Sequence, residues 1–204
     1  MYQGFFLYHP CLFNGFIIQL CYSLFNMLGV KKMENITLEK ITYKNYIKTI
    51  WKLKVTPKQK NFVASNVSSL AEAYVAITNG NVALPFAICK NKKPIGFLMI
   101  GYGANEDDFE GEDPAFTEMA SKSYCLWRFM IDKRYQQKGY GKKAMELALD
   151  YIRTFPCGKA ETVWLSYEPE NEVAKKLYAS FGFVELPQFF KGNEGEEMPA
   201  ILKL

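Results

Sequence analysis

A nearly uninterrupted apolar run at residues 124–132 (YCLWRFMID), followed at once by a turn rich in glycine and lysine, constrains the fold of this chain more than any other feature. A run of this kind, without regular polar alternation, is typical of a strand that is buried on both faces. Residues 141–155 then carry apolar side chains at helical spacing, and Pro156 ends the pattern. The sequence therefore predicts a buried strand that leads through a turn into an amphipathic helix.

The turn has the properties of a phosphate-binding loop. Gly139 and Gly141 allow the backbone to approach a ligand closely, and the helix that follows presents its positive N-terminal end there. Residues 132–143 hold five basic side chains and one acidic one, a local charge of +4 that equals the formal net charge of the whole chain. A bound phosphate or pyrophosphate would explain these features together, and a solvated basic helix start is the alternative.

Two other phosphate motifs fit this turn less well. A Walker A motif requires glycine where Gln136 stands, and serine or threonine where Lys143 stands. The dinucleotide-binding fingerprint lacks its third glycine, because Ala144 occupies that place, and no acidic residue closes a second strand about 20 residues further on.

The pattern of residues 33–204 predicts one domain, in which a mixed sheet is flanked by helices. No internal repeat and no linker rich in proline or serine divides it. Besides the strand already described, predicted strands cover residues 36–41, 82–89, 95–102, 162–167, 183–186 and 199–204. Further predicted helices cover residues 43–55, 58–77 and 171–181, and residues 105–114 form an acidic loop.

The first 30 residues contain no Asp, Glu, Lys or Arg and differ from the rest of the chain. As a signal peptide they lack a basic start and a cleavage site. As a membrane anchor, residues 11–30 are long enough to span a bilayer, although polar residues interrupt them. A third interpretation is that translation starts at Met33, because the codons of residues 29–32 can form a sequence that resembles a bacterial ribosome-binding site. Residues 1–32 would then be a mis-assigned extension.

Composition excludes several kinds of chemistry. The single histidine, His9, lies in the apolar extension, so residues 33–204 hold no Ser-His-Asp triad, no Cys-His dyad and no histidine-rich metal site. Five cysteines without a CxxC pair predict neither a zinc site nor a disulfide framework, and no metal is expected. Scattered, reduced thiols are typical of a cytoplasmic protein.

Two motifs resemble those of the GNAT N-acetyltransferase superfamily. Gln136, Gly139 and Gly141, between a strand and a helix, match its Q-x-x-G-x-G motif. Residues 171–183 (NEVAKKLYASFGF) match its N-x-x-A-x-x-L-Y-x-x-x-G-F helix, and the order of predicted elements over residues 36–204 agrees with the superfamily. The resemblance implies an α/β (α+β) fold with a mixed, mostly antiparallel sheet of six to seven strands, flanked by about four helices.

Within the superfamily, the chain is most similar to bacterial diamine and polyamine (spermine/spermidine) N-acetyltransferases. This narrower resemblance rests on residues 62–66, 69–74 and 126–132. It implies acetyl-CoA as the donor, a small-molecule amine as the acceptor, and direct transfer of the acetyl group in a ternary complex. Because a thioester is already activated, such a transfer depends on positioning and needs no nucleophilic side chain.

The resemblance also implies roles for individual residues. Tyr178 occupies the family's position for the general acid that protonates the departing thiolate, with a core tyrosine as the alternative. The strand before the turn would bind the pantetheine arm and the turn would bind the pyrophosphate. Asn171 would add a contact, or serve only as a helix cap. The expected acetyl-CoA-binding residues are Phe129, Met130, Ile131, Gln136, Gln137, Lys138, Gly139, Tyr140, Gly141, Lys142, Asn171 and Lys175.

The acceptor side has weaker signals. Backbone N–H groups near Met130 and Ile131 are candidates to polarise the carbonyl oxygen as it becomes an oxyanion. Candidates for the base that removes the proton of the amine are Glu118, Asp132, Glu168 and a water relay. The acidic loop and a second acidic cluster (Glu194, Glu196, Glu197) would attract a polycationic amine, unless they are merely solvated. The expected substrate-binding residues are Glu72, Tyr74, Asp107, Asp108 and Glu110.

Three functions therefore stay open: acetylation of a polyamine or diamine, acetylation of a protein N-terminus or an aminoglycoside-type amine, and acetyl-CoA binding by a regulatory module without turnover. Nucleic acid is not expected as a partner, because the basic residues gather at one turn. A membrane is expected as a partner only if residues 1–32 are translated. Dimers are common in the family, so a homodimer stays open although the sequence does not derive one.

Overall fold

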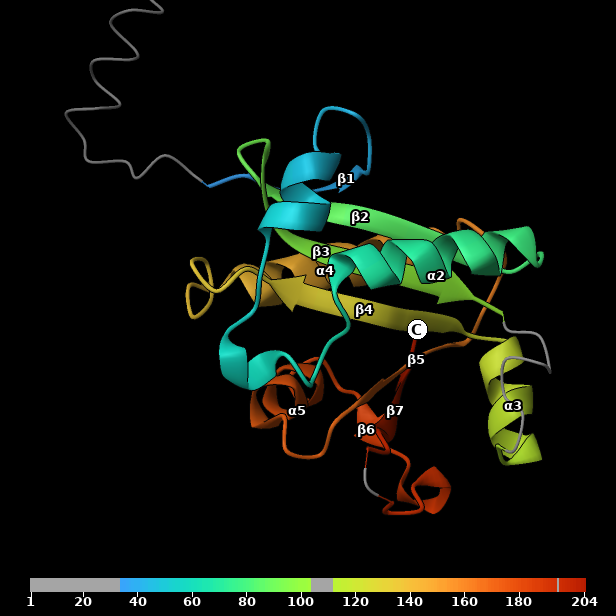
Figure 1. Cartoon of the computed structure of the whole chain (residues 1–204). Coiled ribbons are helices and arrows are strands. Elements are labelled where there is room, and N and C mark those ends of the chain that lie inside the picture. Colours follow the sequence, from blue (N-terminus) through green and yellow to red (C-terminus); the bar gives the residue numbers. More distant parts are fainter. Residues whose placement is uncertain (1–33, 104–111, 194) are drawn as a thin grey trace, which may run out of the picture. The chain divides into compact units, whose positions relative to one another are not determined.

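Seven strands form one sheet, in the order β1-β2-β3-β4-β5-β7-β6 (Figure 1). The computed structural model describes residues 34–103, 112–193 and 195–204, and residues 35–204 form one compact unit. The strands are β1 (Ile36–Lys40), β2 (Val82–Lys90), β3 (Lys93–Tyr102), β4 (Tyr124–Ile131), β5 (Thr162–Tyr167), β6 (Val184–Glu185) and β7 (Met198–Lys203). The helices are η1 (Ile47–Lys52), η2 (Pro57–Gln59), α2 (Asn66–Thr78), α3 (Pro114–Ser121), α4 (Tyr140–Ile152), α5 (Glu172–Ala179) and η4 (Pro187–Phe189).

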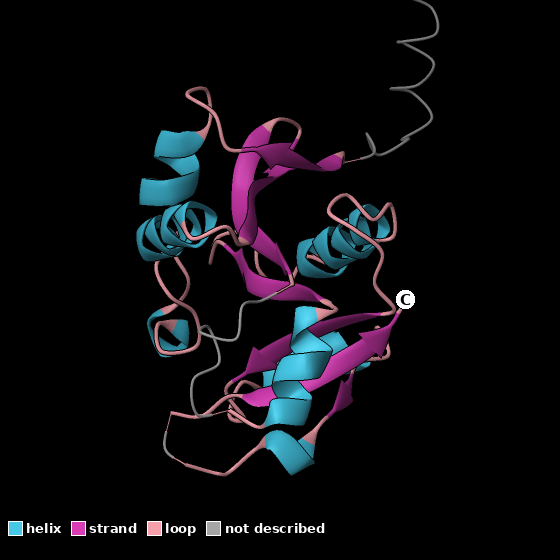
Figure 2. Ribbon diagram, turned by 90° about the vertical axis from the view of Figure 1, so that its right-hand side faces the viewer, coloured by secondary structure: helices cyan, strands magenta, loops and turns pink. Residues whose placement is uncertain are grey.

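The sheet is antiparallel except where β4 and β5 run parallel, and these two strands soon separate. Among the described residues they pair only at Tyr124 and Cys125 of β4. Beyond Cys125, the other edge of β4 stays paired with β3, with a bulge at Trp127, which has no partner on β3. The strands consequently form two groups, β1 to β4 and β5 to β7, which Figure 2 shows parting from each other.

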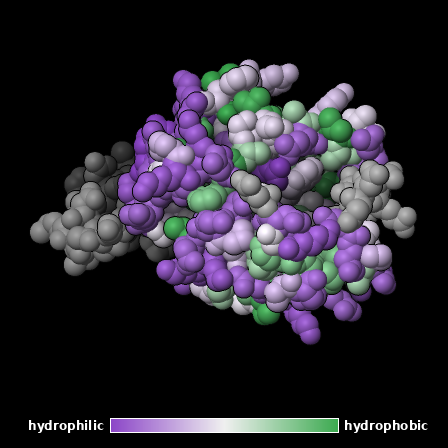
Figure 3. Space-filling model, turned by 60° about the horizontal axis from the view of Figure 1, so that its bottom comes forward, coloured by the Kyte–Doolittle hydropathy of each residue, from purple (hydrophilic) through white to green (hydrophobic). Residues whose placement is uncertain are grey.

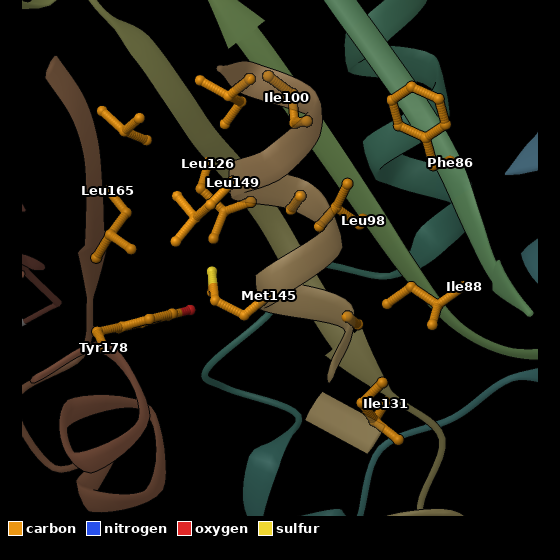
Figure 4. Close-up of a cluster of buried hydrophobic side chains, with 14 of the residues drawn as sticks. Phe86, Ile88, Leu98, Ile100, Leu126, Ile131, Met145, Leu149, Leu165 and Tyr178 are labelled. Atoms are coloured by element: carbon orange, nitrogen blue, oxygen red, sulfur yellow. The ribbon is translucent and has the colours of Figure 1, made fainter. Parts of the chain in front are cut away.

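Helices cover both faces of the sheet, with η1 and α2 on one face and α4 on the other (Figures 1 and 2). Buried side chains form two corresponding groups. The larger group joins α4 to the strands and includes Tyr178 of α5 (Figure 4). The smaller group, on the α2 face, contains Ile50, Leu53, Ala73, Ala83, Phe97, Met99 and Met130. The strand β4 contributes to both groups, so it is the wall that the two layers share.

On the face shown in Figure 3, hydrophilic residues predominate and hydrophobic ones lie in small, separate groups. Isolated apolar residues of this kind are normal on protein surfaces.

The structure confirms the mixed, mostly antiparallel sheet, here with seven strands. It corrects the helices predicted before α2. Within residues 43–55 the regular helix is only the six-residue π-helix η1, because the chain turns extended at Leu53 and the backbone of Lys54 bonds to Asp132 and Lys133, just after β4. The predicted helix at 58–77 is divided into η2 and α2, since Ser65 caps α2 by accepting a hydrogen bond from the backbone N–H of Ser68.

Helix α3 was not expected from the sequence. It starts directly after the acidic stretch, where Asp113 caps it through the N–H of Ala115 and Pro114 occupies its first position. Its Phe116 packs edge-on against Trp164 of β5 at 5.3 Å between ring centres. The helix thus covers the β5 part of the sheet and depends on that contact, which a local pattern does not reveal.

Two predictions lie largely outside the described residues. They concern the nature of residues 1–32 and the structure of the acidic loop between residues 104 and 111. The boundary at residue 33 and the assignment of residues 33–204 as one domain stay predictions. Among the helices that the structure describes, none has the length and apolar character needed to cross a membrane.

Candidate active site

The separation of β4 from β5 creates the central feature of the site. From Phe129 to Ile131, β4 pairs with β3 along one edge, whereas the described part of β5 offers no partner to the other edge. Apart from the carbonyl of Ile131, which accepts a hydrogen bond from Gln136, the peptide N–H and C=O groups on that edge face no strand in the described part of the chain, and backbone polar groups away from water are nearly always paired. An extended ligand that carries amide groups could lie along this edge and satisfy them.

Just beyond β4, Asp132 anchors the loop that leads to α4. Its buried carboxylate accepts hydrogen bonds from the N–H of Lys54, at 2.9 Å, and from the backbone and guanidinium of Arg134, at 2.7–3.1 Å. Burial by itself would raise the pKa of Asp132, but these hydrogen bonds outweigh it and lower the pKa. Asp132 therefore stays charged and fully engaged, which makes it a structural residue and a poor candidate for the general base.

The loop itself has the backbone of an anion site. Gln137 and Gly139 adopt left-handed conformations, with φ of 58° and 78°, and no side chain caps α4. The N–H of Lys143 already bonds to the carbonyl of Gly139, so the N–H groups of the first turn remain for partners outside the helix. Gln137, Lys138, Gly139 and Lys142 are exposed. Together these features suit the pyrophosphate of CoA.

Two residues predicted to bind the donor point their side chains into the protein instead. The amide of Gln136 donates to the carbonyl of Ile131 and to the side chain of Gln59, both at 2.9 Å. Tyr140 is buried and its hydroxyl accepts a hydrogen bond from Lys90. These side chains hold the loop in shape, so only their backbone groups are left to meet a ligand.

Tyr178 lies on α5 and its ring is buried between Tyr167 and Phe183, at centre-to-centre distances of 5.6 and 5.9 Å. Figure 4 shows the hydroxyl pointing toward Met145 of α4, and it has no hydrogen-bond partner in the part of the chain that the structure describes. Burial raises the pKa of Tyr178, and the charge of Glu197 raises it further. The phenol is therefore protonated at neutral pH and able to donate.

The other two predicted donor residues on this side are engaged in local contacts. Asn171 caps α5, since its side chain accepts a hydrogen bond from the N–H of Ala174 at 3.2 Å. Lys175 forms an ion pair with Glu185 at 3.0 Å, and this hydrogen-bonded partner raises the pKa of the lysine. Contacts of either residue with CoA stay predictions.

The residues predicted for the acceptor are not brought together. Glu72 faces β4, where its carboxylate pairs with Arg128 at 2.7 Å and accepts a hydrogen bond from Ser68. Tyr74, two residues further along α2, points away and is 73% exposed, as expected for helix positions that do not share a face. Asp107, Asp108 and Glu110 lie outside the described residues. Their roles in binding substrate stay predictions.

Among the candidate bases, Glu168 has the most suitable surroundings. Burial raises its pKa, and the neighbouring carboxylates of Glu197 and Glu170 raise it further. Glu118, in contrast, is exposed on α3, and the hydrogen bond and charge of Lys122 lower its pKa. A carboxylate with a raised pKa is the better proton acceptor near neutral pH.

The sequence indicated only that Glu197 belongs to an acidic cluster. It did not indicate which residues Glu197 lies close to. It precedes β7, whose Met198 pairs with Tyr167 of β5, so Glu197 lies across from Glu168. Ser166 donates a hydrogen bond to its carboxylate. Neither Glu168 nor Glu197 forms an ion pair with a lysine or arginine within the described ranges, which leaves two negative charges facing each other, and the charge of Glu197 acts on Tyr178.

A pocket of about 410 Å³ opens on the α2 face, beside the end of β4. Its walls are mainly apolar and include Ile50 and Trp51 of η1, Val63, and Met130 of β4. Lys54 and Lys60 also line it, and none of its lining residues is acidic. The pocket therefore suits an apolar or anionic group better than an ammonium group. No cluster of three or more metal-ligating side chains is present among the residues described.

Comparison with known proteins relates the chain to acetyltransferases. The model of the acetyltransferase (GNAT) family matches residues 49–183. The chain is 32% identical over 101 residues to a spermine/spermidine N(1)-acetyltransferase of Bacillus subtilis, covering 47% of this chain and 61% of that protein. It is also 32% identical over 76 residues to N-alpha-acetyltransferase 30 of Saccharomyces cerevisiae, covering 36% of this chain and 42% of that protein. The chain thus spans less than two thirds of the length of these relatives.

Solved structures show a similar fold. The aminoglycoside acetyltransferase AAC(6')-Ib in complex with coenzyme A superposes with a TM-score of 0.60 at 14% identity, covering 83% of this chain and 95% of that one. A spermidine N-acetyltransferase from Vibrio cholerae, in complex with CoA and spermine, superposes with a TM-score of 0.57 at 20% identity, covering 82% and 95%. At these identities the likeness concerns the fold alone.

Proposed function

The chain belongs to the GNAT acetyltransferase family, and on that premise we propose that it transfers an acetyl group from acetyl-CoA to a primary amine of a small polycationic acceptor, a polyamine or diamine. Transfer is direct, in a ternary complex. The observation that carries the proposal is the separation of β4 from β5, with a loop suited to an anion directly after β4.

The donor side follows from the backbone. The pyrophosphate is bound by the N–H groups of residues 137–142 and by Lys138 and Lys142, while the pantetheine arm pairs with the open edge of β4 at Phe129–Ile131. Peptide N–H groups of that edge near Met130 and Ile131 stabilise negative charge on the carbonyl oxygen during attack. The chain thereby holds amine and thioester together, which accounts for several kcal/mol of the barrier.

Proton transfer requires one base and one acid. Glu168 accepts the proton that the ammonium must lose before its nitrogen attacks, directly or through a water molecule. As the C–S bond breaks, the hydroxyl of Tyr178 donates its proton to the departing thiolate. The nitrogen loses its second proton as the amide forms, and that proton returns through water to the phenolate of Tyr178. Glu168 releases its own proton to solvent, so the products are the amide, the thiol and one proton.

A polycationic acceptor is supported by charge. Glu168 and Glu197 lie across from each other, at the end of β5 and the start of β7, without cationic partners in the described part of the chain, so they favour ammonium groups on this side of the opening. The similarity to a spermine/spermidine N(1)-acetyltransferase points in the same direction. A protein N-terminus and an aminoglycoside amine are the competing acceptors, given the other relatives.

The test is release of free CoA thiol from acetyl-CoA in the presence of spermine, spermidine, putrescine, an aminoglycoside or a panel of N-terminal peptides. We expect the highest kcat/KM with a polyamine. A higher kcat/KM for peptides or the aminoglycoside would replace the polyamine as acceptor. Binding of CoA without release in any arm would contradict the enzyme and favour a regulatory module.

A cytoplasmic location, a bacterial source and a homodimer stay predictions. The N-terminal peptide of the native protein, identified by mass spectrometry, decides whether residues 1–32 are translated. A first residue before Met33 would contradict the interpretation that translation starts there.

A further inference from the structure

Arg128 is a cation on β4 in the region where β4 has left β5. It follows the bulge residue Trp127, and its side chain lies on the α2 face of the sheet. One guanidinium nitrogen binds Glu72 at 2.7 Å, another donates to the carbonyl of Trp127 at 2.9 Å, and the group lies 5.6 Å from the centre of the Trp127 ring. Its Nε is buried without a hydrogen-bond partner among the described residues.

The charge of Arg128 cannot be removed by deprotonation, because a guanidinium keeps its proton in proteins. Glu72 is the only carboxylate that pairs with it in the described part of the chain. Across the opening, β5 and the start of β7 present Glu168 and Glu197 instead. An amine that enters between β4 and β5 therefore meets negative charge on the β5 side. On the β4 side it meets Arg128, whose positive charge is cancelled as long as Glu72 pairs with it.

We propose that Glu72 and Arg128 form a charge-matched pair that determines how much positive charge the acceptor can carry. The inference rests on the proposed function, because it assumes that the acceptor amine is acetylated at this opening. Glu72 acts on the acceptor through Arg128: it is a positioning residue that cancels a fixed positive charge, and it does not have to touch the substrate.

A role in stability alone does not explain the pair. Both side chains are partly exposed, 24% for Arg128 and 36% for Glu72, and ion pairs of this exposure contribute little to folding. Their place beside the opening is what distinguishes them from the other ion pairs. Arg153 and Asp150, for example, pair at 3.4 Å at the far end of α4, with exposures of 50% and 71%, and supply a matched control.

The experiment compares Glu72→Gln, Arg128→Gln, the double variant and Arg153→Gln in steady-state kinetics. The acceptors are a series of a monoamine, putrescine, spermidine and spermine. Glu72→Gln should raise KM for spermidine about three- to tenfold, and Arg128→Gln should lower it by a similar factor, as expected for one charge near the surface. Both effects should grow with the charge of the acceptor, be smallest for the monoamine, and shrink at high salt.

The double variant is the decisive arm. It restores a net charge of zero, so its KM should return to within about twofold of the wild type, whereas a purely structural pair would lose function further. Arg153→Gln should leave KM unchanged for every amine. Single variants that shift KM in the same direction, or equally for all amines, would overturn the inference while leaving the acetyltransferase intact.

Failure of the proposed function gives a different result. If the wild type releases no CoA with any amine, the CoA-bound protein and its variants are titrated with spermidine by calorimetry. The same opposite shifts in spermidine affinity would support the charge pair without turnover. Equal affinities in all variants, or no binding, would overturn it.

Discussion

The proposed donor side and the proposed acceptor side of β4 are built in different ways. On the donor side one continuous stretch, residues 129–142, supplies the open strand edge, the left-handed loop and the helix N-terminus. On the acceptor side Glu72, Arg128, Glu168 and Glu197 come from α2, β4, the end of β5 and the start of β7. The donor site is therefore a local property of the chain, whereas the acceptor site exists only after the sheet has assembled.

The difference suggests that the two sides can be altered separately. In the proposal the donor loop binds through backbone groups and the two exposed lysines Lys138 and Lys142, so a change at its other positions acts mainly by disturbing loop shape. The acceptor side works through side-chain charges, so substitutions there act on substrate charge and on pH dependence. Tyr178 and Asp132 test the limits of this separation, because the first lies on α5, outside both groups of residues, and the second connects the donor loop to residue 54.

The largest effect is expected at Tyr178, which belongs to neither side alone. Tyr178→Phe keeps the ring packing against Tyr167 and Phe183 but removes the proton donor. We expect kcat to fall by about 10²–10⁴-fold, with KM for acetyl-CoA and for the amine nearly unchanged. Steady-state kinetics with both substrates varied measures this, and an unchanged kcat would show Tyr178 to be only a core residue.

The next effect is expected at Glu168, on the acceptor side. The base works only when deprotonated, and its pKa is raised by burial and by Glu197, so kcat/KM should fall as the pH drops through that raised pKa. Glu168→Gln should lower kcat/KM about 10²-fold at neutral pH and remove this acidic limb. A pH–rate profile that keeps its acidic limb in the variant would exclude Glu168 as the base.

The next effect concerns folding stability. We expect a substitution of Asp132 to change the free energy of unfolding by about as much as Glu168→Gln changes the activation free energy. Asp132→Asn places an amide among donors that now bond to a carboxylate, and should lower the free energy of unfolding by about 2 kcal/mol. Because its pKa is lowered in the folded state, its contribution is complete above the pKa of the unfolded chain and is lost as the pH falls through the folded value.

Denaturant unfolding between neutral and acid pH checks this prediction. Glu118→Gln, which removes an exposed ion pair with Lys122, is the matched control and should leave the midpoint unchanged. Equal midpoints for Asp132→Asn and the wild type at neutral pH would mean that the connection between the loop and residue 54 contributes nothing to folding.

The smallest effect is expected at Gly139, on the donor side. Its φ of 78° disfavours any residue with a Cβ, although a Cβ there would meet nothing within 4 Å. Gly139→Ala should cost about 1 kcal/mol of backbone strain and raise KM for acetyl-CoA about fivefold, without affecting KM for the amine. Gly80→Ala, with φ of 84° and equal space after α2, carries the same strain and should leave both KM values unchanged. A rise in KM for the amine in Gly139→Ala would contradict the view that the donor side and the acceptor side can be altered separately.

The elements around the donor site were predictable because local rules determine them. The apolar run of β4, the helical spacing of α4 and the motif of α5 all depend on residues close in sequence, and each is found near its predicted place. The helices η1 and α3 were mispredicted or missed, since their extents depend on bonds to β4 and on packing against Trp164. Propensity is a weak guide where tertiary contacts decide.

The sequence alone indicated the family, and it predicted the loop between β4 and α4 and the helix that carries Tyr178, because these depend on glycines, basic residues and motif spacing within short segments. Only the tertiary structure showed that the side chains of Gln136 and Tyr140 point into the protein. It also showed that Arg128 forms an ion pair with Glu72, and that Glu197 lies across from Glu168. The physical reason is that side-chain charges interact over a few ångströms of space. Which charges become neighbours is decided by how the strands pair, and residues 72 and 128, or 168 and 197, become neighbours only in the folded sheet.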